Sequence, residues 1–491
     1  MRQEPLFLLF FRLNVPLFSR FILLIVGLRR AVNHIQGRVS MRNQKVRLLM
    51  SSVFVIALLS GCASPSGGGS TNKAAAETEK PVASAKTDDR KLDLLVPNYY
   101  NDTEKKLWEK VVNKFKELNP DIQVELVAGE VRVESGKLTT MLQSGVTPPD
   151  AILINAGPGR VKTLSDVNLI KPLNDLYTKN KWEEQLRPTA YELIAGDDTI
   201  YEVPHSLDAI MVFYNKDIFE KHGVQAPATQ AEFMTMLEKL KAAGESPITV
   251  GARNGYAIGW LFSNIMESVA GREEVEKLIY ADGKWNDPAF IKAAETLKDW
   301  VDQGFIPKEA VTLTQADSKF SFLSKKAAME VEGTYLISDL ADQKLEDSVA
   351  TFTMPSFIEG KTASPTGGVG LTWVVPTKAE DEELAETWLN FVLSKDFSAI
   401  TLGDPTYNLI PASSSSATIQ PAGPVLAQAI KDIENGFGYN PTVFIGPEAK
   451  EAYYQNLQGL VGGLVTPKQA MDNIEAGAAK DRAAGYQVKK K

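Results

Sequence analysis

The sequence predicts an α/β fold, because strand-like and helix-like runs alternate along the chain from about residue 91. Residues 92–96 form a short apolar run, residues 101–118 carry apolar side chains at helical spacing, and residues 122–126 alternate apolar with polar side chains. A second helical segment precedes the apolar run at 150–155. This β-α-β-α order predicts a mostly parallel sheet covered by helices.

The helix expected at 101–118 has one apolar face. That face consists of Leu107, Val111, Phe115 and Leu118. Pro120 follows and is expected to end the helix, because proline cannot continue it. The next run, at 122–126, is expected to be a half-buried strand.

A second set of elements follows, with a strand expected at 210–215 and a short helix at 216–222. Thr229 and Glu232 have the spacing of a capping box, which predicts the start of a helix. Gly244 is expected to end that helix. The apolar positions of that helix are Phe233, Met236, Leu237 and Leu240.

Further helices are expected within 287–304 and 380–395. In the second of these, one stripe contains Leu384, Trp388, Phe391 and Val392. Trp388 is therefore expected in the core and not at a ligand. The sequence shows no internal repeat of fixed period.

The first 62 residues carry export signals. Basic residues, including Arg42, Lys45 and Arg47, precede a mostly apolar run at 48–59. The run leads into the motif Leu-Ser-Gly-Cys at 59–62. This order is typical of a secretory signal, since a membrane span needs about 20 apolar residues. The single cysteine of the chain, Cys62, ends the motif.

The motif resembles the lipobox of bacterial lipoproteins. The resemblance implies that Cys62 becomes the mature N-terminus and carries acyl chains that anchor the chain to a membrane. Residues 41–61 are then the signal peptide, and 1–40 are expected to be an extension that is not translated. Residues 62–90 are small and polar, which predicts a flexible tether.

The charge and the residue counts exclude several classes of function. From Cys62 onward the chain has 44 basic and 60 acidic side chains, a net charge of −16, which argues against nucleic-acid binding. One cysteine permits no internal disulfide. Only His205 and His222 follow the signal, so neither a histidine-based metal site nor a cofactor is expected.

Several phrases, in order, resemble the extracellular solute-binding proteins of bacterial sugar ABC transporters, the family that includes maltose-binding protein. They are "PPDAILINAGPGRVKTLSDVNLIKPLNDL", "YEVPHSLDAIMVFYNKDIFEKHGVQAPATQAEF", "KKAAMEVEGTYLISDL" and "PTGGVGLTWVVPTKAEDEELAETWLNFV". The resemblance implies a periplasmic-binding-protein-like (type II) fold, in which two mixed α/β lobes are joined by a hinge of crossing segments.

On the family's pattern, residues 91–206 and 371–437 form one lobe, and 207–370 and 438–488 form the other. The crossings are expected near 204–208, 367–371 and 436–441. The glycine-rich run at 367–370 would supply the backbone freedom that a hinge needs.

A sugar site needs aromatic platforms and planar polar side chains. The resemblance places Tyr335 of "EGTYL" at the position that usually stacks on a sugar, and Trp260 of "YAIGWLFSN" at a second aromatic position. Asp208 matches an acidic position at the first crossing, where it could accept from sugar hydroxyls. Arg253 and Tyr256, from the loop before Trp260, are weaker candidates.

The remaining candidates lie near strand ends or in the hinge. They are Asn98, Tyr99, Asn155, Gly367, Gly368 and Trp373. The first three follow strands at the edge where open α/β sheets bind ligands. The glycines would let backbone approach the ligand, and Trp373 could face either the cleft or the core.

The resemblance implies a monomer on the outer face of the cell membrane, which captures a sugar or oligosaccharide and passes it to an ABC transporter permease. The same fold could instead bind polyamine, phosphorylated glycerol or iron. A lipid-anchored glycoside hydrolase is the alternative from another class. The sequence contains no Gly-x-Ser-x-Gly, His-Glu-x-x-His or phosphate-loop motif.

Overall fold

The computed structural model describes residues 90–196, 198–434 and 436–490. All of them belong to one structural unit of the chain, Ala85–Lys491. The expected extension, signal peptide and acylated Cys62 lie outside the described residues, as does the tether up to residue 89. In the described part, no helix combines the length and apolar character needed to cross a membrane.

The first sheet has five strands and mixed directions. In spatial order they are β2 (Ile122–Gly129), β1 (Arg90–Pro97), β3 (Ala151–Asn155), β10 (Leu371–Val374) and β4 (Val203–Pro204). β1 pairs in parallel with β2 and β3, whereas β10 runs antiparallel to β3 and β4. Arg90 pairs with Ile122, so it belongs to β1 and not to the tether that composition predicted.

The second sheet is built around one long strand, β5 (Ser206–Asn215). Its other strands are β12 (Gly438–Tyr439), β9 (Thr366–Val369), β7 (Met329–Gly333), β6 (Ile248–Thr249), β8 (Val349–Phe352) and β11 (Ile410–Pro411). β5 is antiparallel to β7, β8, β9 and β11. The parallel order predicted from residues 92–155 applies to the first sheet, where β1, β2 and β3 confirm it. In the second sheet, strands distant in sequence pair with β5 in antiparallel directions.

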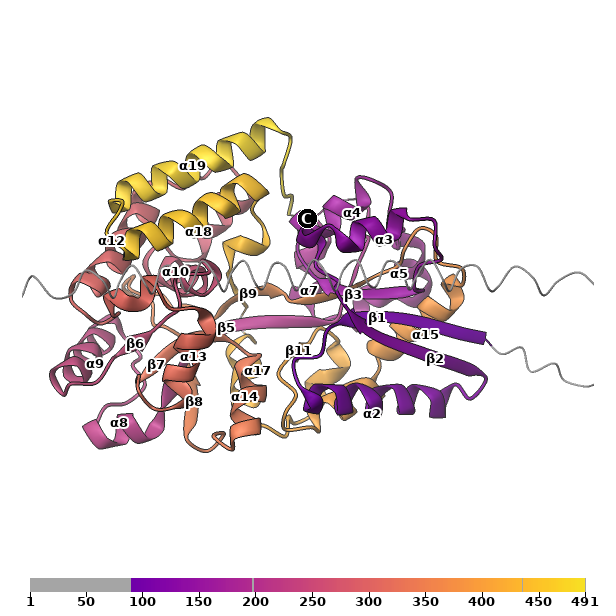
Figure 1. Cartoon of the computed structure of the whole chain (residues 1–491), viewed down its shortest axis with the longest axis horizontal. Coiled ribbons are helices and arrows are strands. Elements are labelled where there is room, and N and C mark those ends of the chain that lie inside the picture. Colours follow the sequence, from indigo (N-terminus) through magenta and orange to yellow (C-terminus); the bar gives the residue numbers. More distant parts are fainter. Residues whose placement is uncertain (1–89, 197, 435, 491) are drawn as a thin grey trace, which may run out of the picture. The chain divides into compact units, whose positions relative to one another are not determined.

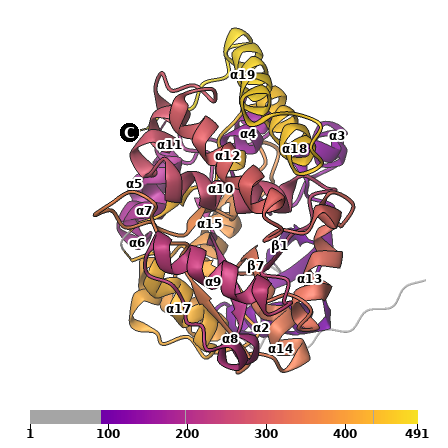
Figure 2. The same ribbon diagram turned by 90° about the vertical axis from the view of Figure 1, so that its left-hand side faces the viewer.

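Helices cover both sheets (Figures 1 and 2). Those between strands of the first sheet, or following β10, are α2 (Asp102–Leu118), α3 (Lys137–Gln143), α4 (Pro158–Ser165), α5 (Asn174–Asn180), α6 (Trp182–Gln185), α7 (Pro188–Ile194), α15 (Glu382–Val392), α16 (Lys395–Leu402) and α17 (Pro424–Asp432). The others are α8 (Lys216–His222), α9 (Gln230–Ala242), α10 (Tyr256–Val269), α11 (Arg272–Tyr280), α12 (Pro288–Asp302), α13 (Gln315–Leu323), α14 (Leu336–Gln343), α18 (Pro447–Val461) and α19 (Pro467–Ala483). Short 3₁₀ turns are η1 (Val133–Ser135), η2 (Lys308–Val311), η3 (Ser414–Thr418) and η4 (Pro441–Val443).

Local sequence signals explain several helices. The capping box of α9 is confirmed: Thr229 and Glu232 exchange side-chain and backbone hydrogen bonds at 3.2 Å. The predicted apolar stripe of α15 is confirmed as buried, with Trp388 in the core. On α2, however, Leu118, the last residue of the helix, is 47 % exposed.

The chain passes between the two sheets at adjacent points. β4 leads through His205 into β5, and β9 leads through Gly370 into β10. The two passages are hydrogen-bonded: the His205 amide donates to the Leu371 carbonyl and the Gly370 amide to the Ser206 carbonyl, both at 2.9 Å. A third passage joins α17 to β12.

The two faces of β5 contact different cores. Leu207, Ala209, Met211 and Phe213 join a core that also contains the first sheet. Ile210 and Val212 join a second core with α9, α10 and α12. This alternation follows from the two-residue period of a strand and sets which side chains meet at the passages.

Candidate ligand-binding site

Three half-buried aromatic side chains form one contiguous group, called here the aromatic group: Tyr256, Trp260 and Tyr335. The ring centroids of Tyr256 and Trp260 are 5.2 Å apart, and those of Trp260 and Tyr335 are 5.5 Å apart. Tyr256 and Trp260 are four residues apart on α10, so they share one helix face. Tyr335 comes from the turn between β7 and α14.

Two glycines lie beside these rings in the sequence. A Cβ atom on Gly333 would lie 2.2 Å from the Tyr335 ring, so the ring lies against bare backbone. Gly255, which precedes α10, has φ +80°, a backbone conformation that residues other than glycine rarely adopt. The position of the Tyr335 ring therefore depends on the missing side chain at Gly333, and the start of α10 on the positive φ of Gly255.

Asp208 lies on β5 at the passage between the sheets. Burial, then Glu332, and then the charge of Asp208 raise the pKa of the Tyr335 hydroxyl. Burial raises the pKa of Asp208 itself to about 6. Among the described residues, no hydrogen bond is found to its carboxylate. Asp208 is therefore a half-buried acceptor without a protein donor.

The predicted glycines lie directly against Asp208. β9 pairs with β5 so that Gly368 is opposite Asp208 and Gly367 is opposite Ala209. A Cβ on Gly367 would lie 1.9 Å from the Asp208 carbonyl oxygen, and one on Gly370 would lie 2.1 Å from its Oδ1. None of these three glycines has a positive φ, so close approach, and not backbone freedom, explains Gly367 and Gly370, whereas a Cβ on Gly368 would make only ordinary contacts.

A hydrogen-bonded relay beneath the rings escaped the sequence interpretation. The Tyr256 hydroxyl donates to Gln315 Oε1 at 3.2 Å, and Gln315 Nε2 donates to Glu332 Oε1 at 2.5 Å. Glu332 is fully buried on β7, and its Oε2 has no partner among the described residues. Burial raises the pKa of Glu332 to about 8, although the hydrogen bond from Gln315 has a smaller, lowering effect on it.

A second acid lies on the same face of β7. Glu330 is two residues before Glu332, is also buried, and accepts from the Ser318 hydroxyl at 2.7 Å. Burial, and then the neighbouring Glu332, raises the pKa of Glu330. Acidic residues within an otherwise apolar strand indicate a functional site, and the sequence prediction did not include these two.

Burial raises the pKa of Asp208, and the charge of Arg160, on α4 among the elements of the first sheet, partly offsets that rise. Its guanidinium donates to the Ala156 carbonyl at 2.7 Å and to Glu134 at 2.6 Å. These contacts hold a planar, multidentate donor near the carboxylate.

The other predicted residues lie elsewhere. Trp373 is fully buried in the first core, with its ring 5.6 Å from that of Trp388, so its assignment as a ligand contact is corrected to a core role. Asn98 is exposed, and half-buried Tyr99 packs against the first core near α2. No hydrogen bond or ring contact between described residues links either of them to the aromatic group.

Two more candidates are also apart from the rings. Asn155 ends β3 and lines a pocket with His205, described below. Arg253 is exposed in the loop before α10. Within the described ranges, no group of three or more His, Cys, Asp or Glu side chains could hold a metal ion.

Two α/β sheets joined by adjacent passages, with an aromatic group beside them, define the type II solute-binding fold. The chain belongs to the bacterial extracellular solute-binding protein family, whose model matches residues 101–397. This finding confirms the resemblance that the sequence suggested.

Individual relatives are distant. An uncharacterised ABC transporter extracellular-binding protein of Pyrococcus horikoshii is 24% identical over 74% of this chain and 81% of its own. The multiple sugar-binding protein of Streptococcus mutans is 22% identical over 63% of this chain and 73% of its own. Among solved structures, a chitin oligosaccharide binding protein is 25% identical, with a TM-score of 0.67 over 81% of this chain and 100% of that one.

Proposed function

We propose that this chain captures a sugar or oligosaccharide and delivers it to the permease of an ABC transporter. The observation that carries the proposal is the aromatic group beside Asp208. A sugar ring has apolar C–H faces and polar hydroxyl edges, so it suits aromatic faces next to an acceptor that lacks a protein donor.

The relay beneath the rings supports the same ligand class. Gln315 and Glu332 fix the edge of Tyr256, and a protonated Glu332 carries little charge at neutral pH. A cation such as a polyamine would gain more from ionised carboxylates. The names of several relatives also refer to sugars, including the multiple sugar-binding protein of S. mutans and a binding protein solved with raffinose.

Closure would follow from the two passages between the sheets. We assign residues 91–206 and 371–437 to one lobe, and 207–370 and 438–488 to the other. A ligand shifts such an equilibrium only through its additional affinity for the closed form, so it must contact both lobes. Arg160, on α4 of the first lobe, is the contact that we assign to that side.

The proposal includes a location and a mode of action. We infer a monomer that is anchored through an acylated Cys62 on the outer face of the cell membrane and that releases its ligand unchanged. Intact-mass measurement of the membrane fraction would detect the acyl chains. Incubation with oligosaccharides should yield no shorter products, and any product would favour the glycoside hydrolase instead.

The test of the proposal is a thermal-shift screen with mono- and oligosaccharides, and with spermidine as the rival ligand, because a true ligand stabilises by mass action. For a sugar that binds, Tyr335→Ala should weaken affinity roughly 30-fold, corresponding to about 2 kcal/mol of lost aromatic contact. Phe320→Ala removes a 64 % exposed aromatic side chain and is the matched control. Stabilisation by spermidine alone, or unchanged affinity in Tyr335→Ala, would reject the proposed ligand or the proposed site.

A further inference from the structure

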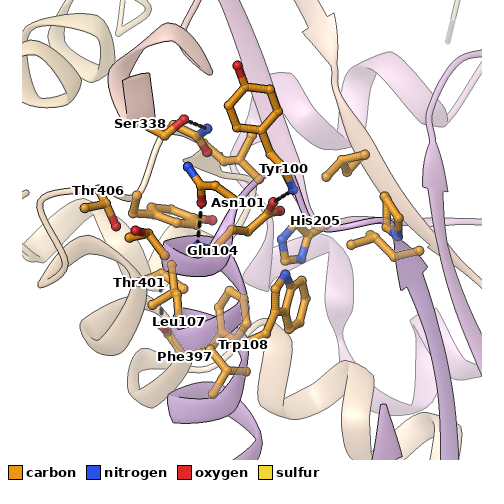
Figure 3. A pocket seen from close by; sticks show the side chains of 18 of the residues that line it. Tyr100, Asn101, Glu104, Leu107, Trp108, His205, Ser338, Phe397, Thr401 and Thr406 are labelled. Atoms are coloured by element: carbon orange, nitrogen blue, oxygen red, sulfur yellow. Dashed lines mark hydrogen bonds between the residues drawn. The ribbon is translucent and has the colours of Figure 1, made fainter. Parts of the chain in front are cut away.

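A separate pocket of about 150 Å³ lies among the N-terminal end of α2, α16 and the 404–409 loop (Figure 3). Its walls are largely apolar. The apolar lining residues include Leu107, Trp108, Leu153, Leu371, Phe397 and Leu409. Ser338 of α14 also lines the pocket, so helices that cover both sheets contribute residues to its walls.

This pocket is on the other side of β5 from the aromatic group. His205, just before β5, stacks on Trp108, and their ring centroids are 5.9 Å apart. The ring centroids of His205 and Phe397 are 5.4 Å apart. The His205 side chain therefore lies on the same face of the strand as Leu207 and Ala209, which join the first core. Asp208 is on the opposite face, because neighbouring residues of a strand alternate.

His205 presents a donor to the pocket. The indole N–H of Trp373 donates to His205 Nδ1 at 3.2 Å, and burial lowers the pKa of His205 to about 3. The neutral ring therefore carries its proton on Nε2. No hydrogen bond to Nε2 is found among the described residues.

Two further polar groups are incompletely paired. Tyr407 is 5 % exposed, and its hydroxyl has no partner among the described residues. Half-buried Glu104 accepts from the Tyr100 amide at 2.6 Å through Oε2, and Oε1 has no hydrogen bond within the described part (Figure 3). Buried polar atoms without partners are costly, so a ligand that pairs with them gains affinity.

We propose that this pocket binds a small neutral aromatic alcohol of about the size of phenol, independently of the solute bound beside Asp208. Apolar cavities of about 150 Å³ accept a molecule the size of benzene. The apolar walls suit the ring, and a hydroxyl can accept from His205 and donate to Tyr407 or Glu104. An anion would instead meet the carboxylate of Glu104.

The test measures phenol binding to the full chain by saturation-transfer NMR and calorimetry. Tyr407→Phe keeps the ring and removes the hydroxyl, so it should weaken binding roughly 5-fold, the effect of one neutral hydrogen bond. Leu409→Trp adds volume at a half-buried position and should abolish binding. Trp260→Ala should leave phenol binding unchanged, because Trp260 does not line the pocket.

Circular dichroism and urea unfolding would confirm that each variant is folded. The proposal is overturned if phenol does not bind, or if folded Leu409→Trp and Tyr407→Phe bind it as the original chain does. Loss of phenol binding in Trp260→Ala would place the probe beside Asp208 and also reject the pocket. None of these outcomes depends on which solute the aromatic group binds.

Discussion

Two aromatic clusters in this protein differ in exposure and in their polar neighbours. Phe115, Trp373 and Trp388 are fully buried, and the rings of Phe115 and Trp373 lie 5.2 Å and 5.6 Å from that of Trp388. Trp260 and Tyr335 contact each other at a similar 5.5 Å, yet both remain half-buried. Ring contacts alone therefore do not distinguish a core from a site.

The polar surroundings make the distinction. Trp388 lies among apolar side chains of the first core; its indole N–H also lacks a partner among the described residues, but the rings around it are fully buried. Beside Trp260 and Tyr335 are a carboxylate without a donor, at Asp208, and a buried acid with a free oxygen, at Glu332. Polar groups that the protein leaves unpaired next to exposed ring faces are what we expect of a ligand site.

The largest effect should come from truncating the buried cluster. Trp388→Ala should lower the free energy of unfolding by about 3–5 kcal/mol, because it leaves a large cavity between α2 and α15. Urea denaturation measures this loss. The matched change Trp260→Ala should cost much less stability, since its ring is half-buried, but should weaken sugar binding more than tenfold.

These two variants can break the comparison. If Trp260→Ala destabilises as much as Trp388→Ala and leaves sugar affinity unaltered in calorimetry, the aromatic group is core and not site. If folded Trp388→Ala loses sugar affinity directly, the buried cluster contributes more to binding than its position indicates.

Sequence periodicity predicted much of the local structure. The apolar faces of α2 and α15 and the capping box of α9 are local patterns, and the structure confirms them apart from Leu118. The directions of the second sheet could not be predicted in this way. β5 pairs with β7, β8 and β9, which lie more than 100 residues away, and no local signal specifies such partners.

The site was predictable only in part. The family resemblance selected Trp260 and Tyr335, which the structure brings into contact. Trp373 was ambiguous because a short strand does not reveal which of its faces is covered. Gln315 and Arg160 escaped notice, since their proximity to the rings and to Asp208 arises from tertiary packing.

An intermediate effect should reveal the buried acid beneath the rings. Glu332 has a folded-state pKa of about 8 against an ordinary value of 4.5, so the folded state binds more protons between these pH values. Stability should therefore fall as pH rises from 4.5 to 8. Glu332→Gln should remove part of this fall, by about 1–2 kcal/mol over that range in urea titrations.

The charges around Glu332 include Glu330, Lys319 and Asp339, and they remain in the variant. Glu238→Gln, at an exposed position of α9, is the control for loss of one acid. An unchanged pH profile in Glu332→Gln would show that this carboxyl is ionised in the folded protein, and the contrast in polar surroundings would then need another origin.

The smallest effect should be the pH dependence of binding through Asp208. Its pKa of about 6 in the free protein means that the carboxylate forms as pH rises through 6, and an ionised oxygen accepts more strongly from a sugar hydroxyl. Affinity should therefore rise several-fold between pH 5 and pH 7, by about 1 kcal/mol. Asp208→Asn should bind weakly at both pH values and lose the dependence, whereas Asp347→Asn, an exposed control, should keep it. Calorimetry at the two pH values measures this, and an Asp208→Asn variant that retains the slope would assign the titration to another group, leaving the aromatic rings as the only part of the site that distinguishes it from the core.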